Sequence, residues 1–217
     1  MPTKWLLRER ERSLRDLNNT ILPNSYLSNF INEAIMQIAS HLFNKLNCEW
    51  GEFKITDLFN YERGSRLIKS NRKSGKYPFV TAGEINLGVK EFISCDKQKI
   101  FNNAITIDMF CNAFVHIYDF CCDDNVLVLK SKTKIDKETM QFICTIINKD
   151  KFKFGYEKQY RQNTLDKHTI LLPIDKFKKP NFDLMSNFIK EIQKSHTQKL
   201  INYYKFLASI GGGGILP

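Results

Sequence analysis

The sequence predicts an α+β protein in which a compact β-rich domain with short helices carries long, coiled-coil-like helices at its N- and C-terminal ends. Apolar residues recur at helical spacing near both ends of the 217-residue chain, which predicts the two helical regions. Between residues 48 and 129 the apolar runs are shorter and are separated by Gly, Asn, Asp or Pro, which is typical of strands joined by turns. Because 42% of the residues are hydrophobic, with 17 Phe and 8 Tyr among them, the chain can build a folded core.

Residues 1–47 are predicted to be helical in two pieces. The piece at 5–17 mixes charges of both signs and has only a thin apolar stripe. Pro23 and Asn24 then break the helix. The piece at 27–46 has a fuller apolar stripe at helical spacing, so it needs a partner to cover that face.

Residues 48–178 form the predicted β-rich domain. The run at 53–59 suits either a strand or a short helix, and further short strands are predicted over residues 77–81, 88–94, 104–110, 113–118 and 125–129. Short strands separated by polar turns predict a compact and mostly antiparallel sheet or barrel. A helix is expected over 137–148 and a last strand over 165–172. No glycine-rich strand-to-helix turn marks a doubly wound nucleotide-binding fold.

Residues 179–210 are predicted to form one long helix that acts as a spacer or dimerisation element. A helix of about 30 residues is about 45 Å long, which is more than a small domain covers by itself. It should therefore pack along another long helix, either residues 27–46 of the same chain or a helix of a second polypeptide. Its stripe comprises Met185, Ile189, Ile192, His196, Lys199, Tyr203, Phe206 and Ile210. His196 is expected to be a packed polar residue that sets register, and residues 211–217 are expected to be a flexible tail.

Positive charge is concentrated in two stretches of the chain. The formal net charge of +10 and the pI near 9.3 favour a polyanionic partner, with nucleic acid first and an anionic membrane surface second. The first stretch places six cations within 14 residues against one carboxylate, and these cations are Arg63, Arg66, Lys69, Arg72, Lys73 and Lys76. The second stretch alternates cations with Phe and Tyr, and its cations are Lys149, Lys151, Lys153, Lys158, Arg161 and Lys167. Such alternation suits a segment laid against a nucleic-acid backbone and equally suits an amphipathic strand with a solvated face.

Membrane insertion and metal binding are both disfavoured by the sequence. No run approaches the roughly 20 apolar residues that span a bilayer, and the N-terminus lacks the apolar core of a signal peptide, so a cytoplasmic protein is expected. The six cysteines form no C-x-x-C pair, and buried reduced thiols are expected rather than a zinc site. The ligands of such a zinc site would be Cys111, His116, Cys121 and Cys122.

Catalytic motifs are missing from the sequence. A methyltransferase would need a glycine-rich cofactor loop and a base-clamping Pro-Pro-aromatic or Pro-Cys element, and the sequence has neither. Turn chemistry explains Asp119, Asp123 and Asp124 better than a nuclease site does, because no Glu/Asp-x-Lys follows them in a strand. No catalytic residue is therefore expected.

Five segments, taken in order, carry a resemblance to a known family. They are DLFNYERGSRLIKSNRKSGKYPFVTAGEINLGVKEF, NNAITIDMF, DDNVLVL, FGYEKQYRQNTLDKHTILLPID and NFDLMSNFIKEI. This succession resembles the target recognition domain of type I restriction-modification specificity (S) subunits, and it is similar to the specificity parts of type IIB and IIG restriction enzymes. The resemblance covers about residues 50–205.

The resemblance implies a DNA-recognition protein that works with partners. A typical S subunit has two such domains, each followed by a long helix, and the helices form an antiparallel coiled coil that spaces two half-sites and docks methyltransferase subunits. With one domain and one following helix, this chain resembles a specificity subunit or half subunit that recognises a half-site in double-stranded DNA. We expect it to form a homodimer or to pair with a second S half, and to dock methyltransferase and restriction subunits. No cofactor is expected in this chain, whereas S-adenosylmethionine is expected on the partner methyltransferase.

The expected mechanism is recognition without catalysis. Lys and Arg side chains would neutralise phosphates, while a few polar side chains would read base edges in the major groove. Phosphate contacts are expected from Lys69, Arg72, Lys73, Lys76 and Lys158. Base contacts are expected from Arg66, Gln159, Arg161 and Asn163, and Arg63 belongs to the same DNA-facing set.

Two other functions are compatible with the sequence. One is a non-specific single-strand or RNA-binding module, which would stack bases on its aromatic side chains. The other is a structural helical scaffold whose basic surface is only solvated.

Overall fold

The computed structural model describes residues 48–210, apart from the side chains of Tyr203 and residues 206–210. The helices expected over residues 1–47 and the tail expected over 211–217 lie outside the described residues. Residues Cys48–Ser186 form one compact unit, and the chain from Asn187 onward belongs to a second unit, which is considered by itself.

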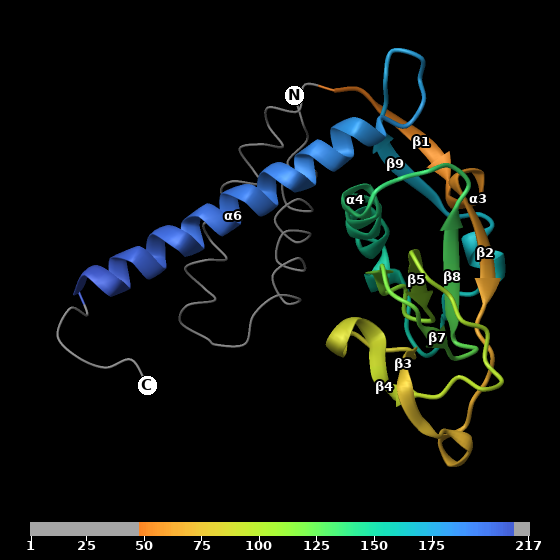
Figure 1. The fold of residues 1–217 in the computed structure, drawn as a ribbon. Coiled ribbons are helices and arrows are strands. Elements are labelled where there is room, and N and C mark those ends of the chain that lie inside the picture. The colour runs from red at the N-terminus through yellow and green to blue at the C-terminus, as the bar shows by residue number, and fades with distance from the viewer. Residues whose placement is uncertain (1–47, 211–217) are drawn as a thin grey trace. The chain divides into compact units, whose positions relative to one another are not determined.

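The described chain consists of short strands and short helices, followed by one long helix (Figure 1). Its first elements are β1 (Trp50–Lys54), α3 (Ile55–Leu58), β2 (Phe59–Arg63), the 3-10 helix η1 (Lys69–Asn71), β3 (Ser74–Val80), the 3-10 helix η2 (Ile85–Gly88), β4 (Val89–Ile93), β5 (Ala104–Asp108) and β6 (Ala113–His116). They are followed by β7 (Cys121–Cys122), β8 (Val126–Ser131), α4 (Lys137–Asn148), the 3-10 helix η3 (Lys151–Lys153), α5 (Gln162–Leu165), β9 (Thr169–Pro173) and α6 (Phe182–Ile210).

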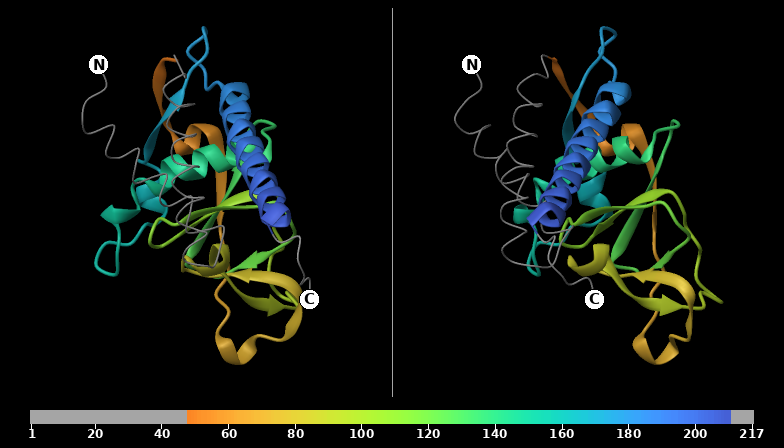
Figure 2. Two further views of the ribbon diagram at one scale, coloured as in Figure 1. Left: turned by 90° about the vertical axis from the view of Figure 1, so that its left-hand side faces the viewer. Right: turned by 60° about the vertical axis from the view of Figure 1, so that its left-hand side comes forward.

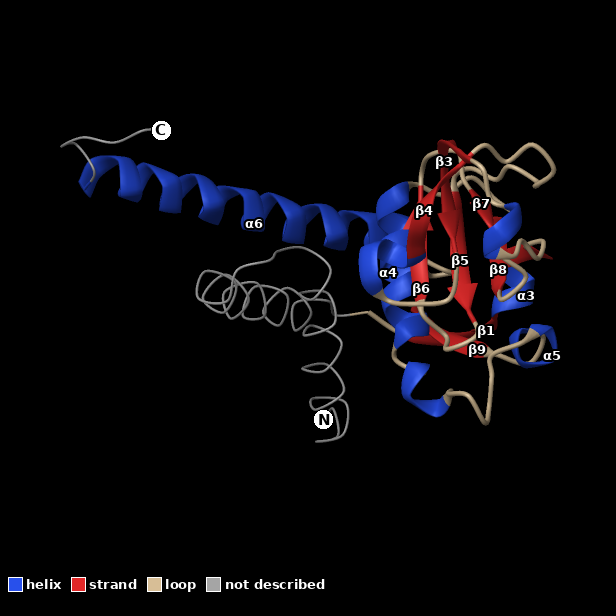
Figure 3. Cartoon of the chain, turned by 90° about the horizontal axis from the view of Figure 1, so that it is seen from below, coloured by secondary structure: helices blue, strands red, loops and turns tan. Residues whose placement is uncertain are grey.

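The central sheet has four strands in the order β2-β8-β5-β6, each antiparallel to its neighbours. Figure 3 shows β6, β5 and β8 of this sheet side by side. Arg63 of β2 pairs with Leu127 of β8, and Asp108 of β5 pairs with Val126 of the same strand. The start of β6 lies beside the end of β5. One end of the sheet therefore collects the C-terminal ends of β2 and β5 and the N-terminal ends of β8 and β6.

Two smaller sheets complete the domain. In the first, β3 lies between β4, with which it is antiparallel, and β7, with which it is parallel. The other joins β1 and β9 as an antiparallel pair from Trp50–Pro173 to Lys54–Thr169. The β3–β4 hairpin and η1 form the gold and yellow lobe seen in Figures 1 and 2. The expectation of mostly antiparallel pairing is confirmed, with β3–β7 as the exception.

The core lies where the central sheet is covered on both faces. All five residues of β5 are buried, and so are the first four residues of β8. A strand covered on both faces needs a nearly continuous apolar sequence, which explains why these strands lack polar alternation. α4 lies alongside β6 and buries Met140, Ile143 and Ile147 (Figure 3). A main core cluster consists of Val80, Phe101, Ala104, Phe120, Cys122, Val126 and Val128.

One carboxylate joins the start of α4 to the start of α6. Asp136 is the N-cap of α4, and its Oδ1 accepts hydrogen bonds from the backbone N–H of Thr139 (2.9 Å) and from the Thr139 hydroxyl (2.6 Å). Its Oδ2 accepts a hydrogen bond from the hydroxyl of Ser186 in the second turn of α6. The Thr139 hydroxyl also lies 3.3 Å from the carbonyl oxygen of Phe182. The first residues of α6 are therefore fixed to the β-rich domain.

The predicted stripe of the long helix is partly described. Met185 is fully buried and Ile189 is buried, while Ile192 and His196 are half-buried. Burial lowers the pKa of His196. The side chains of Tyr203, Phe206 and Ile210 lie outside the described residues. Helix formation over 182–210 confirms the predicted element, and the pairing of this stripe with another helix stays a prediction.

Several element boundaries differ from the predicted ones. The helix at 137–148 is confirmed. The ambiguous run at 53–59 contains the end of β1, all of α3 and the first residue of β2. A strand starting at Leu165 is wrong, because the carbonyl oxygen of Arg161 accepts hydrogen bonds from the backbone N–H groups of Thr164 (2.9 Å) and Leu165 (3.0 Å) and closes a helical turn. The strand instead begins at Thr169.

Cysteine pairing also differs from the prediction. Cys95 and Cys121, whose Cα atoms are 6.6 Å apart, are paired as a disulfide, so the expectation of reduced thiols is wrong for these two residues. The other described cysteines are free, namely Cys48, Cys111, Cys122 and Cys144.

Candidate nucleic-acid interface

Both basic stretches meet at the end of the central sheet where β2 and β5 finish, which we call the basic end. The backbone N–H of Tyr160 donates to the carbonyl oxygen of Met109 (2.8 Å) and brings the second basic stretch to the loop after β5. The N–H of Gly83 donates to Oδ2 of Asp108 (2.8 Å) and brings the β3–β4 loop to the same place. The segments that meet at the basic end are residues 64–73, 81–88, 109–112, 123–125 and 156–161.

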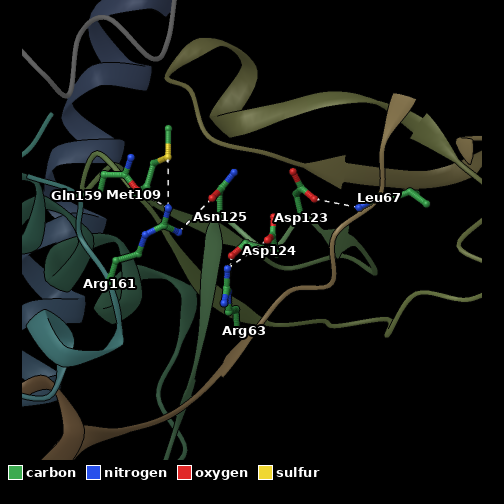
Figure 4. Close-up of polar contacts among 8 residues, drawn as sticks. All are labelled: Arg63, Leu67, Met109, Asp123, Asp124, Asn125, Gln159 and Arg161. Atoms are coloured by element: carbon green, nitrogen blue, oxygen red, sulfur yellow. Dashed lines mark hydrogen bonds and ion pairs between the residues drawn. The ribbon is translucent and has the colours of Figure 1, made fainter. Parts of the chain in front are cut away.

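A three-residue turn between β7 and β8 binds both basic stretches (Figure 4). Asp124 accepts from Arg63 through its carboxylate (Nη2–Oδ2, 3.1 Å) and its backbone carbonyl (2.5 Å). Oδ1 of Asp123 accepts from the N–H of Leu67 (3.1 Å), and Oδ1 of Asn125 accepts from Nη1 of Arg161 (3.0 Å). The 123–125 turn therefore sets the position of one basic stretch relative to the other.

Gly64 allows the first basic loop to lie against this turn. Its N–H donates to the carbonyl oxygen of Val126 (3.0 Å), and the next N–H donates to that of Cys122 (3.1 Å). A Cβ atom at position 64 would lie 2.2 Å from the carbonyl oxygen of Asp123 and 2.5 Å from that of Cys122. Only glycine permits this close approach of two backbones.

The first basic loop presents most of its cations to solvent. Arg66 and Lys69 are exposed, and neither side chain has a hydrogen bond or ion pair with another described residue. Lys73 lies 3.8 Å from Asp96 in an exposed ion pair, which contributes little to stability. Lys76 lies over the ring of Tyr77 at 5.1 Å.

Arg72 differs from its neighbours because its side chain is only 14% exposed. Its Nη1 lies 2.8 Å from Oε1 of Glu91, and its Nε donates to the carbonyl oxygen of Leu67 (3.0 Å). The guanidinium also covers the ring of Phe79 at 4.8 Å. These contacts hold the loop against the β3–β4 hairpin and pair the charge of Arg72 within the protein.

Arg161 is held in place without being neutralised. Its guanidinium is half-buried and donates to the amide oxygens of Asn125 and Gln159. It also lies 4.0 Å from the sulfur of Met109. All these partners are uncharged, and no carboxylate among the described residues pairs with Arg161. The structure therefore orients a guanidinium whose full charge is available to a ligand.

Partly buried hydrogen bonds between side chains brace the second basic stretch. The hydroxyl of Tyr160 lies 2.9 Å from Nδ1 of His168, whose Nε2 lies 3.0 Å from Oδ2 of Asp150. The hydrogen bond from His168 lowers the pKa of Asp150, while burial raises the pKa of Tyr160. Of the predicted contact residues on this stretch, Lys158 and Asn163 are exposed and Gln159 is half-buried.

Asp108 organises the basic end and was not singled out from the sequence. It is 3% exposed, and its carboxylate accepts from Gly83 N, Phe110 N, Asn112 N and Asn112 Nδ2 at 2.8–2.9 Å. Four donors satisfy this buried charge, so it rigidly joins the β3–β4 loop to the β5–β6 loop. The sequence signal for this role was an aspartate at the end of a buried strand, directly before a turn. Which distant loop this aspartate binds is visible only in the fold.

The zinc alternative is not supported among the described residues, where no group of three or more His, Cys, Asp and Glu side chains could hold a metal ion. Oγ1 of Thr106 and the hydroxyl of Tyr118 each lie 3.0 Å from a ring nitrogen of His116. Burial lowers the pKa of His116 to about 4, so the ring is neutral at pH 7.

No helix among residues 48–210 is long and apolar enough to cross a membrane.

Comparison with solved structures identifies the fold. The S subunit of a type I restriction-modification system from M. genitalium matches with a TM-score of 0.59 at 16% identity, over 94% of this chain and 55% of that one. The HsdS subunit from Thermoanaerobacter tengcongensis matches with a TM-score of 0.53 at 12% identity, over 88% of this chain and 48% of that one. The fold is therefore that of restriction-modification S subunits.

Sequence comparison then identifies the family. The chain belongs to the family of type I restriction modification DNA specificity domains, whose model matches residues 47–203. It is also 26% identical over 158 residues to the type II restriction enzyme specificity subunit S.BcgI from Heyndrickxia coagulans. That match covers 71% of this chain and 46% of the relative, so the chain spans about half the length of the relatives it matches. The resemblance expected from the sequence is confirmed.

Proposed function

We propose that the chain is a non-catalytic specificity subunit, or half subunit, of a type I-like restriction-modification system. It recognises a half-site in double-stranded DNA and leaves the chemistry to a methyltransferase subunit that carries S-adenosylmethionine. A restriction subunit joins the same assembly. Membership of a DNA specificity family and the gathering of both basic stretches at one end of a sheet support this proposal.

The observation that carries the proposal is the environment of Arg161. A guanidinium is costly to orient because its long side chain loses rotamer freedom. Here neutral amide groups from Asn125 and Gln159 hold it at the basic end without cancelling its charge. This arrangement suits bidentate donation to a guanine edge, the commonest specific contact of arginine in the major groove.

The remaining contact residues divide by exposure and charge. Lys69, Lys73, Lys76 and Lys158 are exposed and would bind phosphates. The exposed or half-buried polar residues Arg66, Gln159 and Asn163 would join Arg161 in reading bases. Arg63 and Arg72 are paired with Asp124 and Glu91, so in this proposal they position the first basic loop.

A selection experiment tests the function. The full chain, alone and with a cognate methyltransferase subunit, is incubated with 40-base-pair duplexes whose central positions are randomised, and the bound fraction is sequenced. We expect enrichment of a short half-site. Equal affinity for duplex and random single strands would favour a non-specific module instead, and no DNA binding with the methyltransferase present would favour a scaffold.

Three variants then separate base reading from phosphate binding on the selected duplex. Arg161→Ala should weaken binding by roughly tenfold or more and relax preference at one or two positions, since a bidentate base contact is worth about 1–3 kcal/mol. Lys69→Ala should weaken binding to all sequences and lower the salt slope by about one. The control, Lys134→Ala, removes an exposed lysine far from the basic end in the fold and should change neither quantity. Unchanged affinity and preference in Arg161→Ala would remove that residue from the interface.

A further inference from the structure

Two apolar side chains at the basic end are the most exposed large hydrophobic residues of the described chain. Ile85 in the β3–β4 loop is 82% exposed, and Tyr156 in the second basic stretch is 81% exposed. Single exposed apolar side chains are common on protein surfaces, but these two are carried by braced loops within one cationic surface. Ile85 was not singled out from the sequence, whereas Tyr156 is one of the aromatic residues that alternate with cations in the second basic stretch.

The loop that carries Ile85 is rigidly closed. The N–H of Thr81 donates to the carbonyl oxygen of Gly88 (2.8 Å), and the N–H of Gly83 is held by the buried carboxylate of Asp108. Asn86 and Leu87 both have left-handed backbone conformations, with φ of 52° and 57°. Such conformations are unfavourable for residues with a Cβ and persist only where the surroundings enforce them. Ile85 is therefore presented on a fixed backbone.

Tyr156 is also held in a defined orientation. The edge of its ring packs against the ring of Phe110, with centroids 5.1 Å apart and planes at 75°. The N–H of Gly155 donates to the carbonyl oxygen of Lys158 (3.0 Å) and closes the turn that carries Tyr156. Because Phe110 belongs to the β5–β6 loop, the tyrosine ring lies at the basic end with most of its surface open.

The two exposed residues belong to neighbouring segments within the cationic surface. Nζ of Lys151 in the second stretch lies 3.6 Å from Oε2 of Glu84, the residue before Ile85. Phe110 and Asp108, which brace the two loops, are two residues apart. A partner that contacts the exposed cations of the basic end can therefore reach Ile85 and Tyr156 as well.

The chemistry of these side chains limits what they can do on DNA. Isoleucine has no hydrogen-bonding group, so Ile85 cannot read the donor and acceptor pattern of base edges. An apolar side chain on a rigid loop can instead enter a base-pair step and unstack it, and a tyrosine ring can stack on a base so exposed. Resting on the DNA-recognition function proposed above, we propose that Ile85 is a wedge that opens a base-pair step and that Tyr156 is the platform on which the displaced base stacks.

Mismatched DNA tests this proposal independently of the target sequence. The full chain is titrated with a fluorescent 30-base-pair duplex of fixed sequence, either fully paired or with one central mismatch. Unstacking at a mismatch costs less, so the wild-type chain should prefer the mismatched duplex by roughly tenfold. A 2-aminopurine base placed next to the mismatch should gain fluorescence when the chain binds the duplex, because this base leaves the stack.

Variants assign the preference to the two residues. Ile85→Ala and Tyr156→Ala should each reduce the mismatch preference at least severalfold with an unchanged salt slope, whereas Ile85→Met and Tyr156→Phe should retain it. Ile117→Ala is the matched control, because Ile117 is 54% exposed and follows β6 at the opposite end of the sheet. Circular dichroism melts confirm that each variant is folded.

The outcomes separate this inference from the function on which it rests. A wild-type chain that binds duplex DNA with no mismatch preference, or a preference unchanged in Ile85→Ala and Tyr156→Ala, would overturn the wedge alone. If these variants left DNA binding intact but weakened association with a methyltransferase subunit, the exposed pair would be a protein-docking surface, which also overturns the wedge. A wild-type chain that binds no duplex at all would contradict the proposed function and the wedge together.

Discussion

The 123–125 turn uses three polar side chains for three different tasks. Asp124 neutralises Arg63, Asp123 binds a backbone N–H, and Asn125 orients Arg161 without pairing its charge. A carboxylate at position 125 would hold the guanidinium more strongly and would also cancel its charge. The amide at this position therefore separates orientation from neutralisation.

This distinction predicts the effect of Asn125→Asp. The variant keeps a hydrogen-bond acceptor for Arg161, so its free energy of unfolding should stay within about 1 kcal/mol of wild type or rise. Its affinity for the selected duplex should fall by roughly tenfold, because Arg161 would donate to a fixed carboxylate. Urea unfolding and fluorescence anisotropy measure the two quantities. Asn60→Asp adds the same charge at an exposed site of β2, and an equal loss of affinity there would show that net charge alone matters.

A second prediction concerns His116 and pH. Its folded pKa of about 4 lies below the ordinary value of 6.5, so between these values the unfolded chain binds more protons. The contribution of His116 is therefore complete above about pH 6.5 and is lost as the pH falls toward 4. We expect the wild-type free energy of unfolding to decrease by about 2 kcal/mol from pH 7 to pH 5 through this residue.

Comparison with His116→Gln isolates the titration. The variant will be less stable at pH 7, because its side chain cannot reproduce the contacts with Thr106 and Tyr118, but its stability should depend less on pH between 5 and 7. Urea unfolding at several pH values gives both slopes. Equal slopes in variant and wild type would show that His116 does not titrate in this range.

Among the elements, prediction from sequence succeeded where local periodicity decides the structure. α4 and α6 have long apolar stripes and formed where they were expected. The ends of short strands were less accurate, because backbone turns such as the one closed by Arg161 depend on hydrogen bonds that apolar periodicity does not encode. The parallel contact of β3 with the two-residue β7 joins distant segments and leaves almost no local signal.

The joint between α4 and α6 gives a prediction at this scale. Asp136 caps α4 and accepts from Ser186 of α6, so Asp136→Ala should lower the free energy of unfolding by about 2 kcal/mol. Ser186→Ala should cost about 1 kcal/mol. In the double variant the two effects should not add, leaving a coupling of about 1 kcal/mol in a double-mutant cycle. Additive effects would mean that the two residues act independently, and Ser195→Ala provides a control later in α6.

At the scale of the molecule, the sequence predicted which residues carry positive charge but not how they are arranged. The two basic stretches are separated by 72 residues, and their meeting depends on the order β2-β8-β5-β6 and on polar contacts at Asp108 and the 123–125 turn. The same contacts divide the cations into paired ones, such as Arg72, and unpaired ones, such as Arg161. That division cannot be read from a linear charge pattern, because it depends on carboxylates and amides brought in by other strands.

The half-subunit proposal makes a final prediction about assembly. The chain spans about half the length of its relatives, and α6 has 29 residues, a length of about 44 Å. If two copies together form a complete specificity unit, the full chain should have a solution mass of twice the 25.4 kDa of one chain. Ile192→Glu, at a half-buried stripe position, should shift that mass toward 25.4 kDa, whereas Lys194→Glu at an exposed position should not. Light scattering measures both masses, and a wild-type chain that stays at 25.4 kDa alone and with a methyltransferase subunit would contradict the half-subunit model.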